Sequence, residues 1–69
     1  MPEGKVNWFD PEIGFGFITP NDGNKDVFVH ISAIEASGLS TLRKAQLVAY
    51  ETVPGREGFE AAIHLKALK

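Results

Sequence analysis

Gly14-Phe15-Gly16-Phe17-Ile18, followed a turn later by Val27-Phe28-Val29-His30, carries the clearest structural pattern in the chain. Alternate side chains of a strand point to opposite faces, so each segment has two different sides. The Phe and His rings share one side across both segments, and Gly, Ile and Val occupy the other. The aliphatic side predicts a core. An aromatic side without cover in so short a chain predicts a binding surface.

Displayed rings suit unpaired bases, because every base has a face that can stack. The alternative is that these rings are buried core, where Phe is usually found. Glycine on both sides of Phe15 favours an exposed Phe15 ring over a buried one, since glycine inside a strand often marks the close approach of another backbone. We expect Trp8 to be displayed as well, rather than to be a core tryptophan, and its neighbour Phe9 to be partly buried.

The two segments resemble the first and second ribonucleoprotein motifs of bacterial cold-shock proteins, the second extending through Ile31-Ser32. Lys5-Val6-Asn7-Trp8-Phe9 and Leu42 through Gln46 fall where that family has its first strand and a later loop. The resemblance covers nearly all 69 residues. It implies a single cold-shock domain over residues 1–69, folded as an all-β, five-stranded antiparallel OB-type Greek-key barrel. It also implies binding of single-stranded RNA and DNA and a role as an RNA chaperone in transcription or translation.

The strand pattern and the resemblance together predict a set of nucleic-acid-binding residues that includes stacking rings, apolar contacts and three cations. These are Lys5, Asn7, Trp8, Phe15, Phe17, Lys25, Phe28, His30, Ile31, Leu39, Arg56 and Phe59. Phe59 is either a further ring at the site or a loop anchor packed on the barrel.

The chain departs from the family at several of these places. Asn7 and Ile13 stand where lysine is common, and Ile31 and Leu39 stand where an aromatic residue is frequent. Ala45 replaces a usual glycine. The missing cations and rings weaken the expected contacts at the edges of the footprint.

The pattern of apolar residues and turn signals predicts five strands: one ending near Asp10, then 15–19, 26–30, 46–53 and 60–67. Ser32 followed by Glu35 has the spacing of a capping box, which predicts one helical turn over 32–36. Leu42 is expected to anchor the following connection to the core. The residues expected to face inward in the last two strands are Val48, Tyr50, Thr52, Ile63 and Leu65, with His64 and Lys66 outward.

The charge balance is unusual for a nucleic-acid-binding chain. Nine acidic residues against seven Lys and Arg give a formal net charge of −2, whereas cations on phosphates normally supply much of the affinity. The chain must therefore rely on stacking or place its few cations well. No cysteine, no signal-peptide pattern after Met1 and no long apolar run are present, so the expectation is a cytoplasmic protein without membrane contact.

The sequence offers no constellation for catalysis. His30 and His64 have no companion at a metal-ligand spacing, and Gly14-x-Gly16 lacks the third glycine and the helix of a dinucleotide site. We therefore expect a monomer that is not an enzyme, with no metal, cofactor or small-molecule substrate. The alternative function is a small-barrel protein-interaction module whose aromatic face docks a peptide or partner protein.

Overall fold

Five strands and one short helix form the described part of the chain. The computed structural model describes residues 1–55 and 58–68. The strands are β1 (Glu3–Asp10), β2 (Phe15–Pro20), β3 (Val27–His30), β4 (Leu47–Pro54) and β5 (Glu60–Ala67), and the helix is α1 (Ile31–Ala36). The expected strands are all present, although β2 includes Pro20, β3 begins one residue late at Val27, and β4 is shifted by one residue, to Leu47–Pro54.

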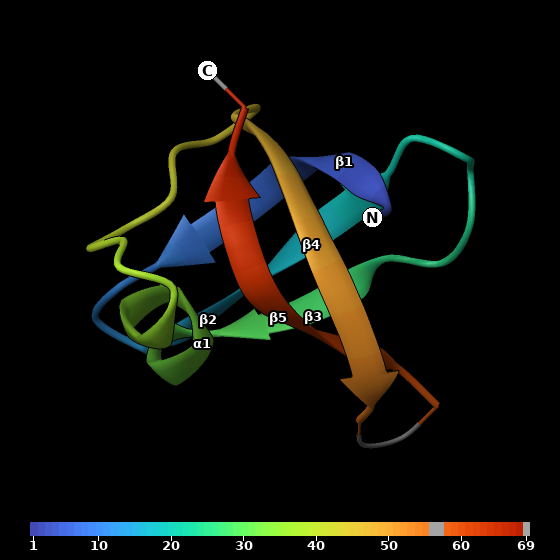
Figure 1. Ribbon diagram of the computed structural model, residues 1–69. Coiled ribbons are helices and arrows are strands. Elements are labelled where there is room, and N and C mark those ends of the chain that lie inside the picture. The colour runs from blue at the N-terminus through green and yellow to red at the C-terminus, as the bar shows by residue number, and fades with distance from the viewer. Residues whose placement is uncertain (56–57, 69) are drawn as a thin grey trace.

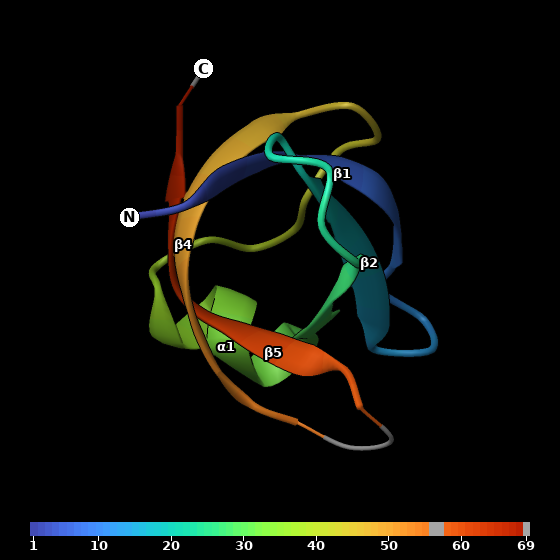
Figure 2. The same ribbon diagram turned by 90° about the vertical axis from the view of Figure 1, so that its right-hand side faces the viewer.

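The strands close into a barrel in the order β1-β2-β3-β5-β4. Neighbouring strands are antiparallel except at the closure, where β3 and β5 meet in parallel through the pair Phe28 and Ala61. In Figure 1, β4 and β5 cross the β1–β3 sheet and α1 lies at one end of it; Figure 2 shows the strands arranged around the barrel. The predicted five-stranded OB-type barrel is thus confirmed. The parallel pairing of β3 with β5, which closes the barrel, cannot be predicted from the alternation of apolar and polar residues.

The aliphatic sides of the strands meet inside this barrel. Val6, Ile18, Val29 and Val48 are at most 1% exposed, as the alternation in β1–β4 predicts. Outside the strands, α1 and the connection after it each add one buried side chain. The whole core cluster is Val6, Ile18, Val27, Val29, Ile34, Leu42, Val48, Tyr50, Ala62 and Leu65. The expected anchoring by Leu42 is therefore confirmed, while Thr52 is only half-buried.

A β-bulge in β5 changes which residues face the core. His64 has a φ of 51°, and His64 and Leu65 together occupy the space opposite Tyr50. Ala62 and Leu65, three positions apart, consequently face inward. The prediction that Ile63 faces the core is wrong, because Ile63 lies before the bulge and is only half-buried.

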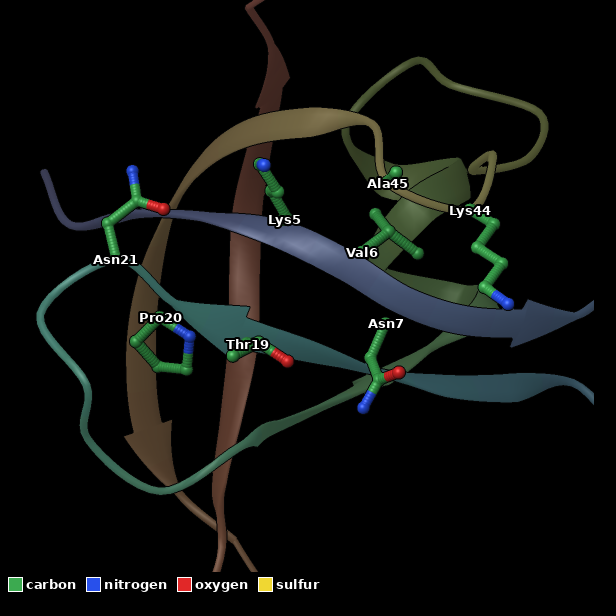
Figure 3. Close-up of a pocket in the computed structure, with 8 residues that line it drawn as sticks. All are labelled: Lys5, Val6, Asn7, Thr19, Pro20, Asn21, Lys44 and Ala45. Atoms are coloured by element: carbon green, nitrogen blue, oxygen red, sulfur yellow. The ribbon is translucent and has the colours of Figure 1, made fainter.

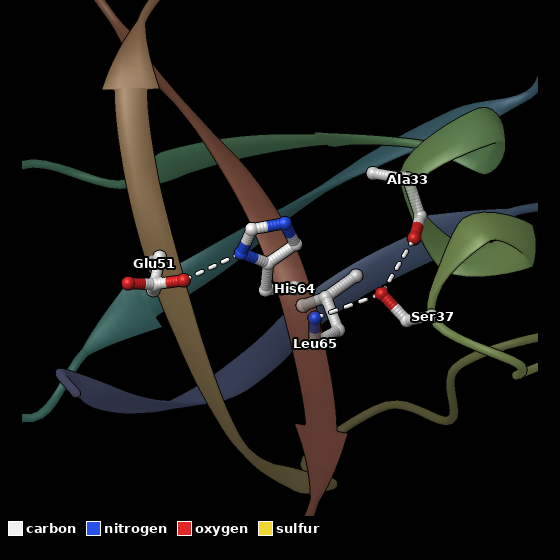
Figure 4. Close-up of polar contacts among 5 residues, drawn as sticks. All are labelled: Ala33, Ser37, Glu51, His64 and Leu65. Carbon is white, nitrogen blue, oxygen red and sulfur yellow. Dashed lines mark hydrogen bonds and ion pairs between the residues drawn. The ribbon is translucent and has the colours of Figure 1, made fainter.

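The bulge is tied to the end of α1. The backbone N–H of Leu65 donates to Ser37 Oγ at 2.8 Å, and the Ser37 hydroxyl donates to the Ala33 carbonyl at 2.8 Å (Figure 4). On the outer side, the His64 ring contacts the Glu51 carboxylate of β4, and both side chains are exposed. The bulge thus has polar partners on both sides of the strand.

The start of α1 differs from the predicted capping box. The helix begins at Ile31, so Ser32 and Glu35 both lie within it, and the N-cap is His30. His30 has extended backbone angles at the end of β3, and its Nδ1 accepts the Ser32 N–H at 3.1 Å. The Nδ1 atom of His30 thus accepts the N–H of the first turn of α1 and caps the helix in place of the Ser32 hydroxyl. Within the described residues, no helix is long and apolar enough to cross a membrane.

Candidate nucleic-acid interface

A register shift in β1 places Trp8 on the outside of the barrel. Val6 pairs with Ile18 and Trp8 pairs with Phe17, which leaves Asn7 as an extra residue between them. Val6 is buried, whereas Trp8 is 37% exposed. Phe9 packs partly against the core on the opposite side of the strand. Both expectations for this adjacent pair are confirmed, and the bulge is what permits them.

Six rings form a continuous surface that we call the aromatic row. Its centre is set by the β2–β3 register, which places Phe15 opposite His30 and Phe17 opposite Phe28. Successive ring centroids lie 5.5 to 6.3 Å apart, a range in which aromatic pairs attract each other. The members are His30, Phe28, Phe15, Trp8, Phe17 and Phe59. None of them belongs to the core cluster, so the prediction that these rings are not core is confirmed. Trp8 and His30 are exposed, and the four Phe rings are half-buried against each other.

Gly16 allows β1 and β2 to approach closely beneath this row. A Cβ built on Gly16 would lie 2.2 Å from the Trp8 carbonyl oxygen and 2.7 Å from the Phe9 Cα. Both are backbone atoms, which a change of side-chain rotamer could not move away. The glycine beside Phe15 therefore lets the two strands bring Trp8 against the Phe15 and Phe17 rings, as the sequence pattern predicts.

His30 ends the row and has a fixed ring orientation. Because its Nδ1 accepts the Ser32 N–H, the ring proton of the neutral imidazole is on Nε2, where it can serve as a donor. Ser32 Oγ also lies 2.9 Å from Nδ1. Sequence reasoning missed this role of Ser32, although a His-x-Ser spacing at the junction of a strand and a helix is the signal that could have identified it.

Phe59 and Lys25 extend the row at its other end. The Phe59 ring lies 5.6 Å from the Phe17 ring, which places it in the row. Lys25 Nζ lies 5.0 Å from the Phe59 centroid, a cation–π distance. Lys25 therefore brings a positive charge to the edge of the rings.

The remaining predicted site residues are less closely grouped. Ile31 is half-buried beside the start of β2, where its N–H donates to the Gly14 carbonyl at 2.9 Å. Asn7 donates to Asp26 Oδ2 at 3.2 Å, and Lys5 points outward opposite Thr19. Leu39 packs against the core instead of joining the row. Arg56 lies outside the described residues.

The charge next to the aromatic row is mixed. Asp10 pairs with Phe15 across β1 and β2, Asp26 lies beside Asn7, and Lys25 contacts the Phe59 ring. Such a surface offers ring faces more readily than positive charge. What this arrangement can do chemically is to stack flat, unpaired ring systems.

These features define a class of protein: a small closed OB-type β-barrel that displays a row of aromatic rings on its outer surface. The model of the "cold-shock" DNA-binding domain family matches residues 2–66. The chain is 52% identical over 66 residues to the cold shock-like protein CspC of Shigella flexneri, covering 96% of this chain and 94% of that protein. It is 53% identical over 60 residues to the cold shock-like protein CspE of Escherichia coli K12, covering 87% of each.

The chain therefore belongs to the cold-shock domain family. The cold shock-like protein CspE of Buchnera aphidicola subsp. Acyrthosiphon pisum is also 53% identical over 60 residues. This membership favours nucleic acid over a docked peptide as the ligand of the aromatic row.

Proposed function

We propose that this chain binds single-stranded RNA and DNA by stacking successive bases on the aromatic row, without a chemical step. The observation that supports the proposal is the continuity of six rings outside the core, across β1, β2, β3 and the residue before β5. Stacking contributes about 1–3 kcal/mol per base and tolerates most sequences. A few stacked bases, less the cost of ordering a flexible strand, correspond to roughly micromolar binding.

Within this proposal, the predicted site residues have different tasks. Bases stack on Trp8, Phe17, Phe28 and His30, with Phe15 beside them. The phosphates of the bound strand are contacted by three cations, Lys25, Lys5 and Arg56. Ile31 adds an apolar contact at the edge.

A stacking surface selects single strands, because a duplex hides the faces of its bases. Binding would keep transcripts unpaired, which is the activity of an RNA chaperone and would affect translation or transcription termination. The match to a family model described as a DNA-binding domain supports the nucleic-acid binding on which this role depends. We further propose that the chain acts as a monomer, as one domain over residues 1–69, in the cytoplasm where transcripts are made and read.

Replacing rings of the row tests the proposal. Phe15→Ala and Phe28→Ala should each greatly weaken binding of a single-stranded oligonucleotide while the barrel still folds, because both rings lie outside the core cluster. Some loss of stability is expected, since the rings also pack on each other. Binding is measured by titration, and folding by circular dichroism and thermal unfolding.

Phe9→Leu is the matched control, because Phe9 packs on the core and not in the row. It should lower the thermal stability and leave the affinity of the folded protein nearly unchanged. The proposal fails if Phe15→Ala and Phe28→Ala lose thermal stability but their folded fraction binds as tightly as the parent chain.

A further inference from the structure

The outer surface that carries the aromatic row continues beyond Phe17 and Trp8. Thr19 is two positions after Phe17 on β2, points to the same side, and pairs with Lys5 of β1. This pair forms part of the wall of a hollow of about 480 Å³, shown in Figure 3. The lining residues that carry polar side chains are Lys5, Asn7, Thr19, Asn21 and Lys44. The hollow therefore begins where the rings end.

Positive charge gathers along this surface. A second hollow, of about 520 Å³, shares Lys44 and Ala45 with the first and adds Arg43. In the described part of the chain, no Asp or Glu lines either hollow. Asp26 accepts a hydrogen bond from Asn7 at the edge. A chain with nine acidic and seven basic residues thus groups three of its cations on a surface free of lining carboxylates. Such a surface attracts an anion.

Lys44 is held in place by a tight turn docked on β1. The Gln46 N–H donates to the Arg43 carbonyl at 3.1 Å, so Lys44 and Ala45 are the central residues of the turn. The Ala45 N–H donates to the Val6 carbonyl at 2.7 Å, and the Val6 N–H donates to the Gln46 carbonyl at 2.9 Å. In Figure 3, Lys5 and Lys44 lie on either side of Val6 and Ala45. The two lysines are therefore fixed at their Cα atoms relative to each other.

We propose that the hollow lined by Lys5, Asn7, Thr19, Asn21 and Lys44, which we call the lysine groove, binds the sugar–phosphate backbone of a single strand where it continues past Trp8 and Phe17. The lysine ammonium groups contact phosphate oxygens, and the Thr and Asn side chains donate to phosphate or sugar oxygens. The groove adds affinity and no base preference. This inference rests on the proposed function and lengthens the strand that the site holds.

Lys44→Gln tests the groove, because it removes one charge at an exposed position. Lys66→Gln is the matched control: Lys66 is exposed on β5 and lines neither hollow. Each protein is titrated with oligothymidylates of about four and about ten nucleotides, lengths within the range of OB-fold sites. Titrations at several salt concentrations give the slope of log K against log salt. Circular dichroism verifies that both variants are folded.

The longer strand should lose affinity severalfold on Lys44→Gln, and its salt slope should fall by about 0.7, the value for one phosphate contact in a single strand. The short strand should bind Lys44→Gln as it binds the parent chain, and Lys66→Gln should match the parent with both strands. Equal effects of the two substitutions, or an equal loss with both strand lengths, would overturn the inference alone. Failure of the parent chain to bind either strand would overturn the proposed function with it.

Discussion

Ala45 has a backbone conformation that suits glycine. Its φ of 67° is in the left-handed region, at the third position of a turn in which Lys44 is the second residue. A type II turn needs a positive φ at this position, and a Cβ there is strained. A glycine at this place would be free of this strain, so the expected departure from the family at Ala45 has a structural consequence.

Ala45→Gly should therefore stabilise the chain. We expect the free energy of unfolding to rise by about 1 kcal/mol, the strain of a left-handed residue with a Cβ. For a domain of this size, that change raises the melting temperature by about 4–8 °C. Ala36→Gly at the end of α1 is the control and should lower the stability, because glycine disfavours a helix. A melting temperature for Ala45→Gly at or below that of the parent would show that the turn is unstrained.

Tyr50 links stability to alkaline pH. It is 1% exposed, and its burial, followed by the charges of Asp22 and Glu60, raises its pKa above the ordinary value of 10.0. The folded chain thus keeps the phenol protonated where the unfolded chain loses the proton. This contribution is fully present below about pH 10 and is lost as the pH rises through the folded pKa.

The free energy of unfolding should therefore decline more steeply above about pH 10 in the parent than in Tyr50→Phe. Denaturant titrations of both proteins between neutral and alkaline pH measure the difference, and the lysines titrate equally in both. Parallel curves would mean that folding leaves the Tyr50 ionisation unchanged. As the chain has one tyrosine, the absorbance of tyrosinate reports the same ionisation directly.

The sequence predicts where the central rings of the aromatic row lie, but not where the residues around the row lie. Phe15, Phe17 and Phe28 follow from strand alternation, because the strands pair in register over this stretch. Leu39 follows a helix, where no such period applies, and it packs on the core. Lys44 lines the same hollow as Asn7, although it lies 37 positions later in the chain. The turn that contains Lys44 is hydrogen-bonded to Val6 of β1, which places Lys44 near Asn7. Tertiary contacts of this kind leave no local pattern.

Among the elements, β5 departs most from what alternation predicts. Its bulge depends on His64 in a left-handed conformation, which few residues other than glycine adopt, and the sequence around His64 has no turn signal. The capping of α1 was also misjudged, because the residue that caps it is the last residue of β3. The bulge lies inside β5 and the cap lies where β3 meets α1, and neither leaves a period in the sequence. Where strands pair without a register shift, as β2 and β3 do, alternation predicts which side chains face the core.

Ser37→Ala tests how strongly α1 supports the β5 bulge. The substitution removes the oxygen that accepts the Leu65 N–H and leaves this part-buried donor without its partner. We expect the free energy of unfolding to fall by about 1–3 kcal/mol. Ser40→Ala, at an exposed position of the following connection, should change it little. Denaturant unfolding compares the three proteins; equal stability of Ser37→Ala and the parent would mean that the bulge is stable without this contact.

For the whole molecule, barrel closure separates two functions of the apolar residues. Aliphatic side chains fill the interior, and most of the aromatic rings are left for the outer surface. The net charge of −2 by itself is unfavourable for binding nucleic acid, but it says nothing about how the charges are distributed over the surface. The structure shows cations grouped at Lys5, Arg43 and Lys44, and a row of rings with few cations beside it. Stacking is therefore the central feature of the proposed binding, and charge is secondary.

The most direct measurement is a titration of Trp8 fluorescence with a single-stranded oligonucleotide and with the duplex of the same sequence at moderate salt. Trp8 is the one tryptophan of the chain and contacts the Phe15 and Phe17 rings of the row. Base stacking on this surface predicts strong quenching and far tighter binding by the single strand, with mild preference among bases. Equal affinity for duplex and single strand, or binding that leaves Trp8 unquenched, would contradict it.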